Sequence, residues 1–297
     1  PSKSRLPDDF NSADNYGSGL VYDGTNLMFV SRQTDSTTRL FVLEDGLQEW
    51  TSLKLPPYIK MLNEKNEKNF DLNDARGPNL AIFKNKLHIA YVQQEEGNLK
   101  PWPCITVNLG GENFTAPRGI VAFPARGRIA LASSKDRLFA SFRYFHSENN
   151  YQKLGFAWSD DGYWNWNFKE LSYLSATDPS LLIKGDILYL ITQVTSIPLQ
   201  ASSTIRMSRY SLKTNKWDPH ISVFDTSKLP YPISMPENDS SGFGINSFSG
   251  GDFDESKIYI FSRNSKEIQG QERGYFVTTF LGNETQYKKY QPIDEKK

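Results

Sequence analysis

Cysteine is almost missing from this sequence of 297 residues, which has a single one, Cys104. One cysteine excludes an internal disulfide and any zinc site built from cysteine ligands. We interpret Cys104 as a small buried residue on a strand, because nothing in its neighbourhood indicates a reactive thiolate. Histidine is nearly as scarce, and His88, His146 and His220 are far apart in the sequence. We therefore expect no metal ion and no cofactor.

The chain also lacks an excess of charge, a long apolar run and the common nucleotide and hydrolase motifs. Lys and Arg together number 34, as do Asp and Glu, so we expect no nucleic acid partner. No apolar stretch approaches the roughly 18 residues of a membrane helix, so we expect no membrane insertion. The patterns GxGxxG, GxxxxGK(S/T), HExxH and GxSxG are absent.

Aromatic residues are plentiful, and several of them close a repeated motif. The motif consists of an acidic residue, then Asp and Gly, and a Trp four residues after the Gly. It occurs in LEDGLQEW (43–50) and WSDDGYWNW (158–166). Looser copies lie at 103–114, 204–217 and 274–287, and a second recurring run precedes each copy, at 26–32, 86–93, 137–143, 187–193 and 257–263. Such short β-branched and aromatic runs, spaced about ten residues apart, are typical of antiparallel meanders.

Five modules of four short strands predict an all-β fold, a five-bladed β-propeller with four-stranded antiparallel blades. The turns between the first two strands carry turn-forming residues, in DGTN, KNK, SKD, KGD and DES. A sandwich of two sheets would also bury such strands, but it gives no reason for five matched turns. We expect a single domain over residues 1–297, with blades at about 17–56, 76–118, 127–174, 177–223 and 243–293 and insertions at 57–75 and 224–242.

Long polar side chains recur near the ends of the second strands, and they are candidates for ligand binding. Guanidinium groups offer fixed donors for hydroxyls and carboxylates, and equivalent positions of a propeller lie on one ring. The alternative is that the arginines tie neighbouring blades by pairing with Asp or with backbone carbonyls. Candidate stacking surfaces complete the set, and Trp102, between Pro101 and Pro103, is expected on an exposed loop. The predicted ligand-binding residues are Arg32, Arg143, Arg263, Gln193, Trp102, Trp158 and Trp164.

The Asp-Gly motif and His88 are interpreted as structural. The carboxylate of the motif is expected to cap backbone N–H groups in the turn between the third and fourth strands, where Gly takes a positive φ. The Trp that follows is expected to pack between blades.

Carboxylates were considered as catalysts because glycoside hydrolysis needs two of them about 5–10 Å apart. Asp178 begins a first strand, in TDPSLLIKGDILYLI, and Asp74 stands in a similar place before Arg76. No glutamate of a regular module joins them, and Glu237 lies in an insertion. Asp178 is therefore interpreted as a cap at the start of a strand in preference to a catalyst.

Three families share parts of this pattern. GPNLAIFKNKLHIAY, residues 77–91, resembles the blade repeat of bacterial and fungal five-bladed propeller lectins that bind fucose or sialic acid. That resemblance implies sugars held between neighbouring blades by Arg, by Glu or Gln, and by a stacking Trp or Tyr. SDDGYWNW is similar to the Asp box of sialidases at Ser159, Asp161 and Trp166. TDPSLLIKGDILYLI resembles a strand start in five-bladed arabinanase- and xylosidase-type glycosidases.

The function expected from these features is the binding of glycans without cleavage, by a secreted or extracellular lectin-like propeller. Three Asn-x-Ser/Thr triplets, at Asn113, Asn238 and Asn283, would accept glycans in a secreted protein. The first alternative is a glycoside hydrolase that uses Asp178 and Asp74 as its carboxylates. If the protein is an enzyme, this is the class of activity that we expect. The second alternative is a propeller that binds proteins.

Overall fold

The computed structural model describes residues 19–34, 38–44, 49–54, 58–63, 66–71, 75–93, 102–111, 113–145, 152–174, 178–195, 203–225, 246–249, 257–263 and 275–281. All regular elements among them are β-strands. The described residues contain no helix that is long and apolar enough to cross a membrane.

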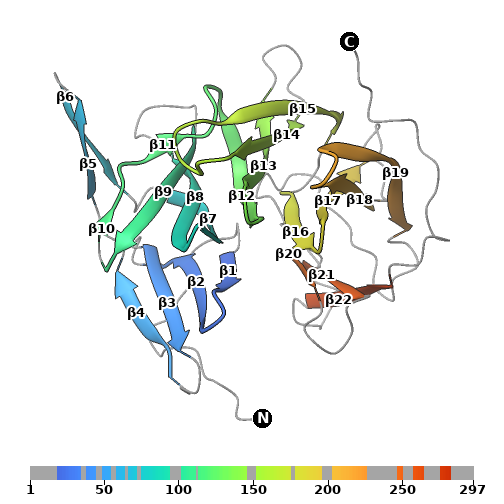
Figure 1. The fold of residues 1–297 in the computed structure, drawn as a ribbon, viewed down its shortest axis with the longest axis horizontal. Helices are drawn as coiled ribbons and strands as arrows, with labels where there is room; N and C mark the ends of the chain where they lie inside the picture. Colours follow the sequence, from blue (N-terminus) through green and yellow to red (C-terminus); the bar gives the residue numbers. More distant parts are fainter. Residues whose placement is uncertain are drawn as a thin grey trace. The chain divides into compact units, whose positions relative to one another are not determined.

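Apart from one separate hairpin, the strands form consecutive meander sheets, one in each predicted module (Figure 1). The first sheet contains β1 (Gly19–Tyr22), β2 (Asn26–Arg32), β3 (Thr38–Glu44) and β4 (Thr51–Lys54). The second contains β7 (Ala75–Phe83), β8 (Lys86–Gln93), β9 (Trp102–Gly110), β10 (Asn113–Phe114) and, beside β9, β11 (Arg118–Gly119). The third contains β12 (Ala125–Ser133), β13 (Leu138–Phe145), β14 (Gln152–Ser159) and β15 (Asn167–Leu174).

The fourth and fifth sheets continue the same pattern. The fourth contains β16 (Ser180–Lys184), β17 (Ile187–Thr195), β18 (Ser203–Ser211) and β19 (Lys216–Asp225). The fifth contains β20 (Asn246–Ser249), β21 (Lys257–Arg263) and β22 (Tyr275–Leu281), and its predicted fourth strand falls outside the described residues. The all-β fold of antiparallel four-stranded sheets is thus confirmed.

One element was not predicted. Within the insertion 57–75, β5 (Tyr58–Asn63) and β6 (Asn66–Asp71) pair as an antiparallel hairpin of their own. The other insertion, 224–242, lies outside the described residues apart from the end of β19.

The chain divides into two compact units, residues 1–140 with 157–169 and residues 141–156 with 170–297. The division crosses strands of the third sheet and does not follow a linker, and the prediction of a single domain stays a prediction. Within each unit, first strands of consecutive sheets contact each other: β1 with β7 and β7 with β12 in the first unit, and β16 with β20 in the second. Contact between successive first strands is what a propeller requires of its innermost strands.

The first unit shows how closely these inner strands approach. A Cβ atom on Gly19 would lie 2.5 Å from the Cα of Asn79 and 2.6 Å from the N of Leu80, so only glycine fits there. The Asn79 amide Nδ2 donates to the carbonyl of Ile129 at 3.0 Å, and the Ser133 hydroxyl donates to the carbonyl of Ile82 at 2.5 Å. Side chains of β7 and β12 therefore replace a hydrogen-bond ladder where the two sheets meet.

The middle strands are buried on both faces, and this explains why their sequences are almost continuously apolar. Every residue of β8 after Lys86 is buried, and Ile89, Tyr91 and Cys104 belong to one apolar cluster. Cys104 is thus a buried strand residue, as predicted. In the second unit Phe156 packs against Tyr210 and Trp217 with ring centroids 5.5 and 5.0 Å away. Trp217 therefore joins the fourth sheet to the third.

The turn chemistry read from the sequence is present in the structure. Lys84 and Asn85 both have positive φ, 49° and 58°, which matches a two-residue turn between β7 and β8. The Asp23 carboxylate accepts the N–H groups of Thr25 at 2.8 Å and Asn26 at 2.6 Å in the turn between β1 and β2.

The turn at residues 159–165, between β14 and β15, confirms the interpretation of the Asp-Gly motif. Asp161 Oδ1 accepts the backbone N–H groups of Tyr163, Trp164 and Asn165 at 2.8, 2.8 and 3.2 Å. Gly162 has a φ of +77° and donates its N–H to the Ser159 hydroxyl at 2.8 Å. The corresponding Asp45 and Gly46 lie outside the described residues.

Candidate active site

An ion pair between Arg143 and Asp178 is the most deeply buried pair of charges in the described part of the chain. Arg143 lies in β13, and Asp178 stands two residues before β16, followed by Pro179. The side chains are 3% and 0% exposed. Asp178 Oδ1 accepts from Arg143 Nε at 2.8 Å and lies 2.7 Å from Nη2. Both members belong to the second unit.

The two oxygens of Asp178 have different surroundings. Oδ1 takes both contacts with the guanidinium, whereas Oδ2 is buried and makes no hydrogen bond to a described residue. A buried carboxylate normally satisfies its remaining lone pairs, because an unpaired buried polar atom costs free energy. Oδ2 is therefore the atom of this site with unused capacity to accept a proton or a hydrogen bond.

The burial of the arginine follows from the strand that carries it. Every residue of β13 from Leu138 to Tyr144 is buried, so the charge of Arg143 cannot reach solvent along this strand. Removing one member of such a pair leaves the other as an uncompensated charge. The alternative interpretation of Arg143, pairing with an Asp of a neighbouring blade, therefore describes what this residue does in the structure.

The other predicted strand-end residues are not assembled into one site by the described contacts. Arg32 and Arg263 are the last residues of β2 and β21, whereas Gln193 lies within β17. Arg32 is half-buried, and the side chains of Gln193 and Arg263 lie outside the described set. A ligand-binding role for these residues stays a prediction.

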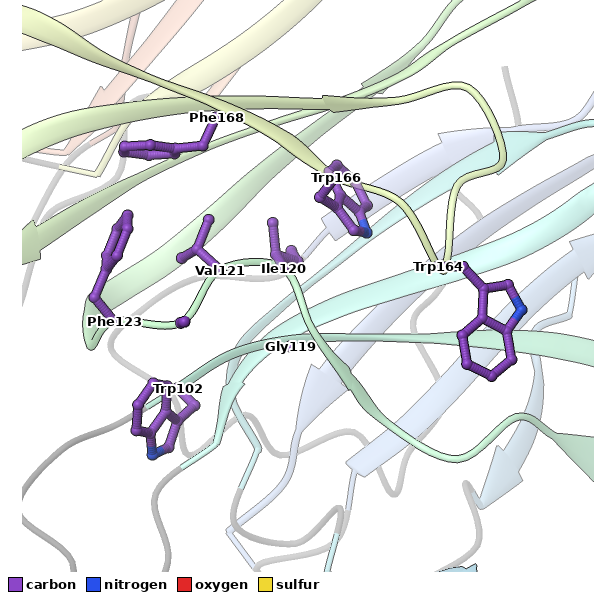
Figure 2. Close-up of a pocket in the computed structure, with 9 residues that line it drawn as sticks. Trp102, Gly119, Ile120, Val121, Phe123, Trp164, Trp166 and Phe168 are labelled. Carbon is purple, nitrogen blue, oxygen red and sulfur yellow. The ribbon is translucent and has the colours of Figure 1, made fainter.

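The predicted tryptophans separate into two groups. Trp102 and Trp164 line one pocket of about 580 Å³ in the first unit, while Trp158 is half-buried on β14 and is not part of its lining (Figure 2). The expectation that Trp102 lies on an exposed loop is wrong. It is the first residue of β9, is half-buried, and packs against the apolar cluster, because the strand begins directly after Pro101. Trp164 is 61% exposed, on the turn after β14.

Sequence reasoning missed the remaining walls of this pocket. They are Gly119, Ile120, Val121, Ala122, Phe123, Trp166 and Phe168. Trp166 was noted only as the end of a turn motif, and the segment between β11 and β12 carried no signal of its own.

The structure does not describe the other carboxylates that were considered as catalysts. Asp74 and Glu237 lie outside the described residues. Among the described residues, no group of three or more His, Cys, Asp and Glu side chains could hold a metal ion.

Two further titratable groups, Asp161 and His88, have roles in the structure of the turns and strands that carry them. Desolvation alone would raise the pKa of Asp161, but the N–H donors of Tyr163, Asn165 and Trp164, together with the Ser159 hydroxyl, outweigh it and hold the pKa well below its usual value. Burial lowers the pKa of His88, whose Nδ1–H donates to the Lys86 carbonyl, 2.9 Å away. The ring of His88 also packs edge-on to Phe83, so its predicted structural role fits.

No family model matches the sequence, and no curated protein is significantly similar to it. Solved structures do share the fold. A thermostable family-43 glycoside hydrolase has 10% identity and a TM-score of 0.52 over 97% of this chain and 98% of that one. An α-L-arabinofuranosidase from Lactobacillus brevis has 12% identity and a TM-score of 0.58 over 95% and 96%. An exo-1,5-α-L-arabinanase from a bovine ruminal metagenomic library has 10% identity and a TM-score of 0.50 over 93% and 95%.

These comparisons correct the expected function. The expectation of a lectin-like propeller that binds glycans without cleavage, on the pattern of bacterial and fungal lectins, is wrong, because the similar structures are glycoside hydrolases. The error has a physical cause: the repeated runs at 77–91 and elsewhere encode the strands and turns of a blade, which propellers of different function share. At 10–12% identity the likenesses establish the fold, and the chain is a β-propeller.

Proposed function

We propose that this β-propeller is a glycoside hydrolase and that cleavage depends on Asp178. The observation that carries the proposal is the state of this carboxylate, which is completely buried, is held through Oδ1 by Arg143, and has an Oδ2 that no described residue hydrogen-bonds. Asp178 also stands two residues before β16, the first strand of its sheet, and the sequence around it resembles a strand start of arabinanase- and xylosidase-type glycosidases. The solved structures that share the fold support this class of reaction.

Hydrolysis of a glycosidic bond adds water across it. One carboxylic acid protonates the departing oxygen, while a carboxylate removes a proton from water or attacks the anomeric carbon. As the anionic member of an ion pair, Asp178 fits the second role and not the first. Arg143 then acts as a positioning residue, since its two contacts fix Oδ1 and leave Oδ2 for the reaction. Because Asp178 is 0% exposed, the proposal requires that substrate binding opens a path to Oδ2.

The partner carboxylate and the substrate belong to the same proposal. Asp74, the other carboxylate that the sequence suggested, takes the role of proton donor in this proposal. Glycans are the proposed partners. The first substrates to test are α-L-arabinofuranosides, because two of the similar structures are named as an α-L-arabinofuranosidase and an arabinanase. A protein with this activity meets its polymeric substrates outside the cell, so secretion is proposed as well, and fractionation of the source cells tests it.

The experiment is a panel of 4-nitrophenyl glycosides with arabinofuranosyl, xylopyranosyl and galactopyranosyl groups, together with arabinan. We expect nitrophenol or reducing ends to be released, and we expect Asp178→Asn to lower kcat by about 10²- to 10⁴-fold. The matched control is Asp186→Asn, which removes a carboxylate that pairs with Lys213 at the surface of the same sheet. Circular dichroism at the assay temperature shows that each variant is folded.

Two results contradict the proposal. The first is the absence of release from every glycoside and from arabinan by folded protein. The second is full activity in folded Asp178→Asn, which would leave the buried pair with a purely structural role.

A further inference from the structure

The aromatic pocket of the first unit is a separate feature with its own construction. The short strand β11 extends the edge of β9, with Arg118 opposite Ile105, Gly119 opposite Cys104, and the Ile120 N–H donated to the Pro103 carbonyl at 2.8 Å. This pairing holds the segment after β11 beside Trp102. The hydroxyl of Tyr163 donates to the carbonyl of Ala116, which attaches the turn that carries Trp164 to the same region.

The side chains that line the pocket are almost entirely apolar. Five of its nine residues are aromatic, and Phe123 and Phe168 meet edge to face with centroids 4.7 Å apart. Figure 2 shows these two rings together, Trp166 beside Ile120 and Val121, and Trp164 at the opposite end of the view. Its volume of about 580 Å³ falls within the range of about 300–1,000 Å³ that is usual for small-molecule sites.

This chemistry does not suit a sugar. None of the nine lining residues carries a carboxylate, an amide or a hydroxyl, and the only polar side-chain groups among them are indole N–H donors. The hydroxyls of a sugar need acceptors as well as donors, and a buried hydroxyl without a partner loses the hydrogen bonds that water gave it. Flat apolar walls instead suit a flat apolar ligand, which gains area burial and ring-to-ring contact.

Two polar features indicate where a ligand would carry its polar group. The indole Nε1 of Trp166 is buried and has no hydrogen-bond partner among the described residues. Arg118, directly before Gly119 in the chain, holds its guanidinium carbon 3.6 Å from the ring centroid of Trp164. Among the ion pairs that the described residues form, none includes Arg118. Of these two groups only Arg118 is accessible, because the Trp166 Nε1 is closed off from solvent, so the pocket has one positive charge beside its apolar side chains.

We propose that this pocket binds an aromatic carboxylate, with the ring between the tryptophan and phenylalanine side chains and the carboxylate near Arg118. Stacking on Trp164 limits the freedom of the guanidinium, so less conformational entropy is lost when it pairs with an anion. The proposal concerns the first unit and does not depend on Asp178.

The test is calorimetric titration with trans-cinnamate, supported by saturation-transfer NMR of its ring protons. We expect saturable binding with a Kd of about 1 mM or below for a ligand of this size. Arg118→Gln is expected to weaken cinnamate about three- to tenfold and to leave the uncharged cinnamyl alcohol unchanged. Lys135→Gln, which removes an exposed cation elsewhere in the same unit, is the matched control and is expected to change neither affinity.

A further ligand separates the contribution of the planar ring to affinity from that of the charge. Cyclohexanepropionate, which has the charge without the planar ring, is expected to bind at least about tenfold more weakly than cinnamate.

Three results overturn the proposal. They are the absence of saturable cinnamate binding to folded protein, equal affinity for cinnamate in Arg118→Gln and the original chain, and tighter binding of methyl glycosides than of cinnamate. Cinnamate binding that persists in Asp178→Asn is expected, because the two sites are built from different residues.

Discussion

The strongest quantitative prediction concerns the buried pair of Arg143 and Asp178. Arg143→Met leaves Asp178 without its positive partner in a position that is 0% exposed, and Asp178→Leu leaves Arg143 without its negative partner at 3% exposure. Breaking a buried pair by removing one member costs about 3–5 kcal/mol. A protein domain is stable by only about 5–15 kcal/mol, so either variant is expected to lose a large part of its free energy of unfolding.

The double variant, Arg143→Met with Asp178→Leu, is expected to behave differently. It removes both charges at once, and apolar replacements of buried pairs are commonly neutral or stabilising. We expect its free energy of unfolding to lie within about 2 kcal/mol of that of the original chain, so that the two single effects are far from additive. Catalysis should nevertheless be lost, since the proposed reaction needs the carboxylate.

Urea unfolding followed by tryptophan fluorescence measures these differences, with equal slopes required for the comparison. Lys213→Met, which breaks an ion pair whose members are 75% and 57% exposed, is the control and should change the midpoint little. The reasoning is refuted if each single variant costs less than about 1 kcal/mol or if the double variant shows the sum of the single effects.

Three further predictions concern the turn before β15 and the aromatic cluster of the second unit. Gly162→Ala should cost about 2–4 kcal/mol in thermal unfolding, because φ is +77° and the new Cβ would lie 2.8 Å from Phe83 Cδ1 and 2.9 Å from His88 Nε2; an unchanged Tm contradicts this. The lowered pKa of Asp161 contributes stability above its unfolded value of about 3.9, and this contribution is lost as the pH falls through the folded pKa. The stability difference between the original chain and Asp161→Ala should therefore shrink from pH 5 towards pH 2, and a constant difference argues against it. Trp217→Ala should lower the free energy of unfolding by about 2–4 kcal/mol, since it loses contact with Phe156 at 5.0 Å; a loss below 1 kcal/mol would mean that the two sheets do not meet there.

The strands and tight turns could be predicted from the sequence because their causes are local. Asp161 accepts N–H groups only two to four residues away in the chain. Lys84 and Asn85, which have positive φ, lie between two apolar runs that the sequence predicts as paired strands. The hairpin β5–β6 was missed because YIKMLN lacks a distinct alternation and NEKNFD is polar apart from Phe70.

The candidate site was predicted only in parts. The sequence suggested Arg143 as a hydrogen-bond donor to a ligand and Asp178 as a catalytic carboxylate of the alternative function. That the two residues pair with each other did not follow from the sequence. The two residues are 35 positions apart, and the contact depends on how β13 packs against the start of β16. The lining of the aromatic pocket was missed for the same reason, because Gly119 and Ile120 are placed by pairing with β9 and carry no motif.

The turn around Asp161 has a consequence for how the chain acquires its structure. All five of the donors that this carboxylate accepts come from Ser159, Tyr163, Trp164 and Asn165, so closing the turn requires only a short loop and little entropy. A segment of this kind can form before distant strands have met, and it brings β14 and β15 into alignment early. The third sheet can therefore act as a starting point from which its neighbours assemble.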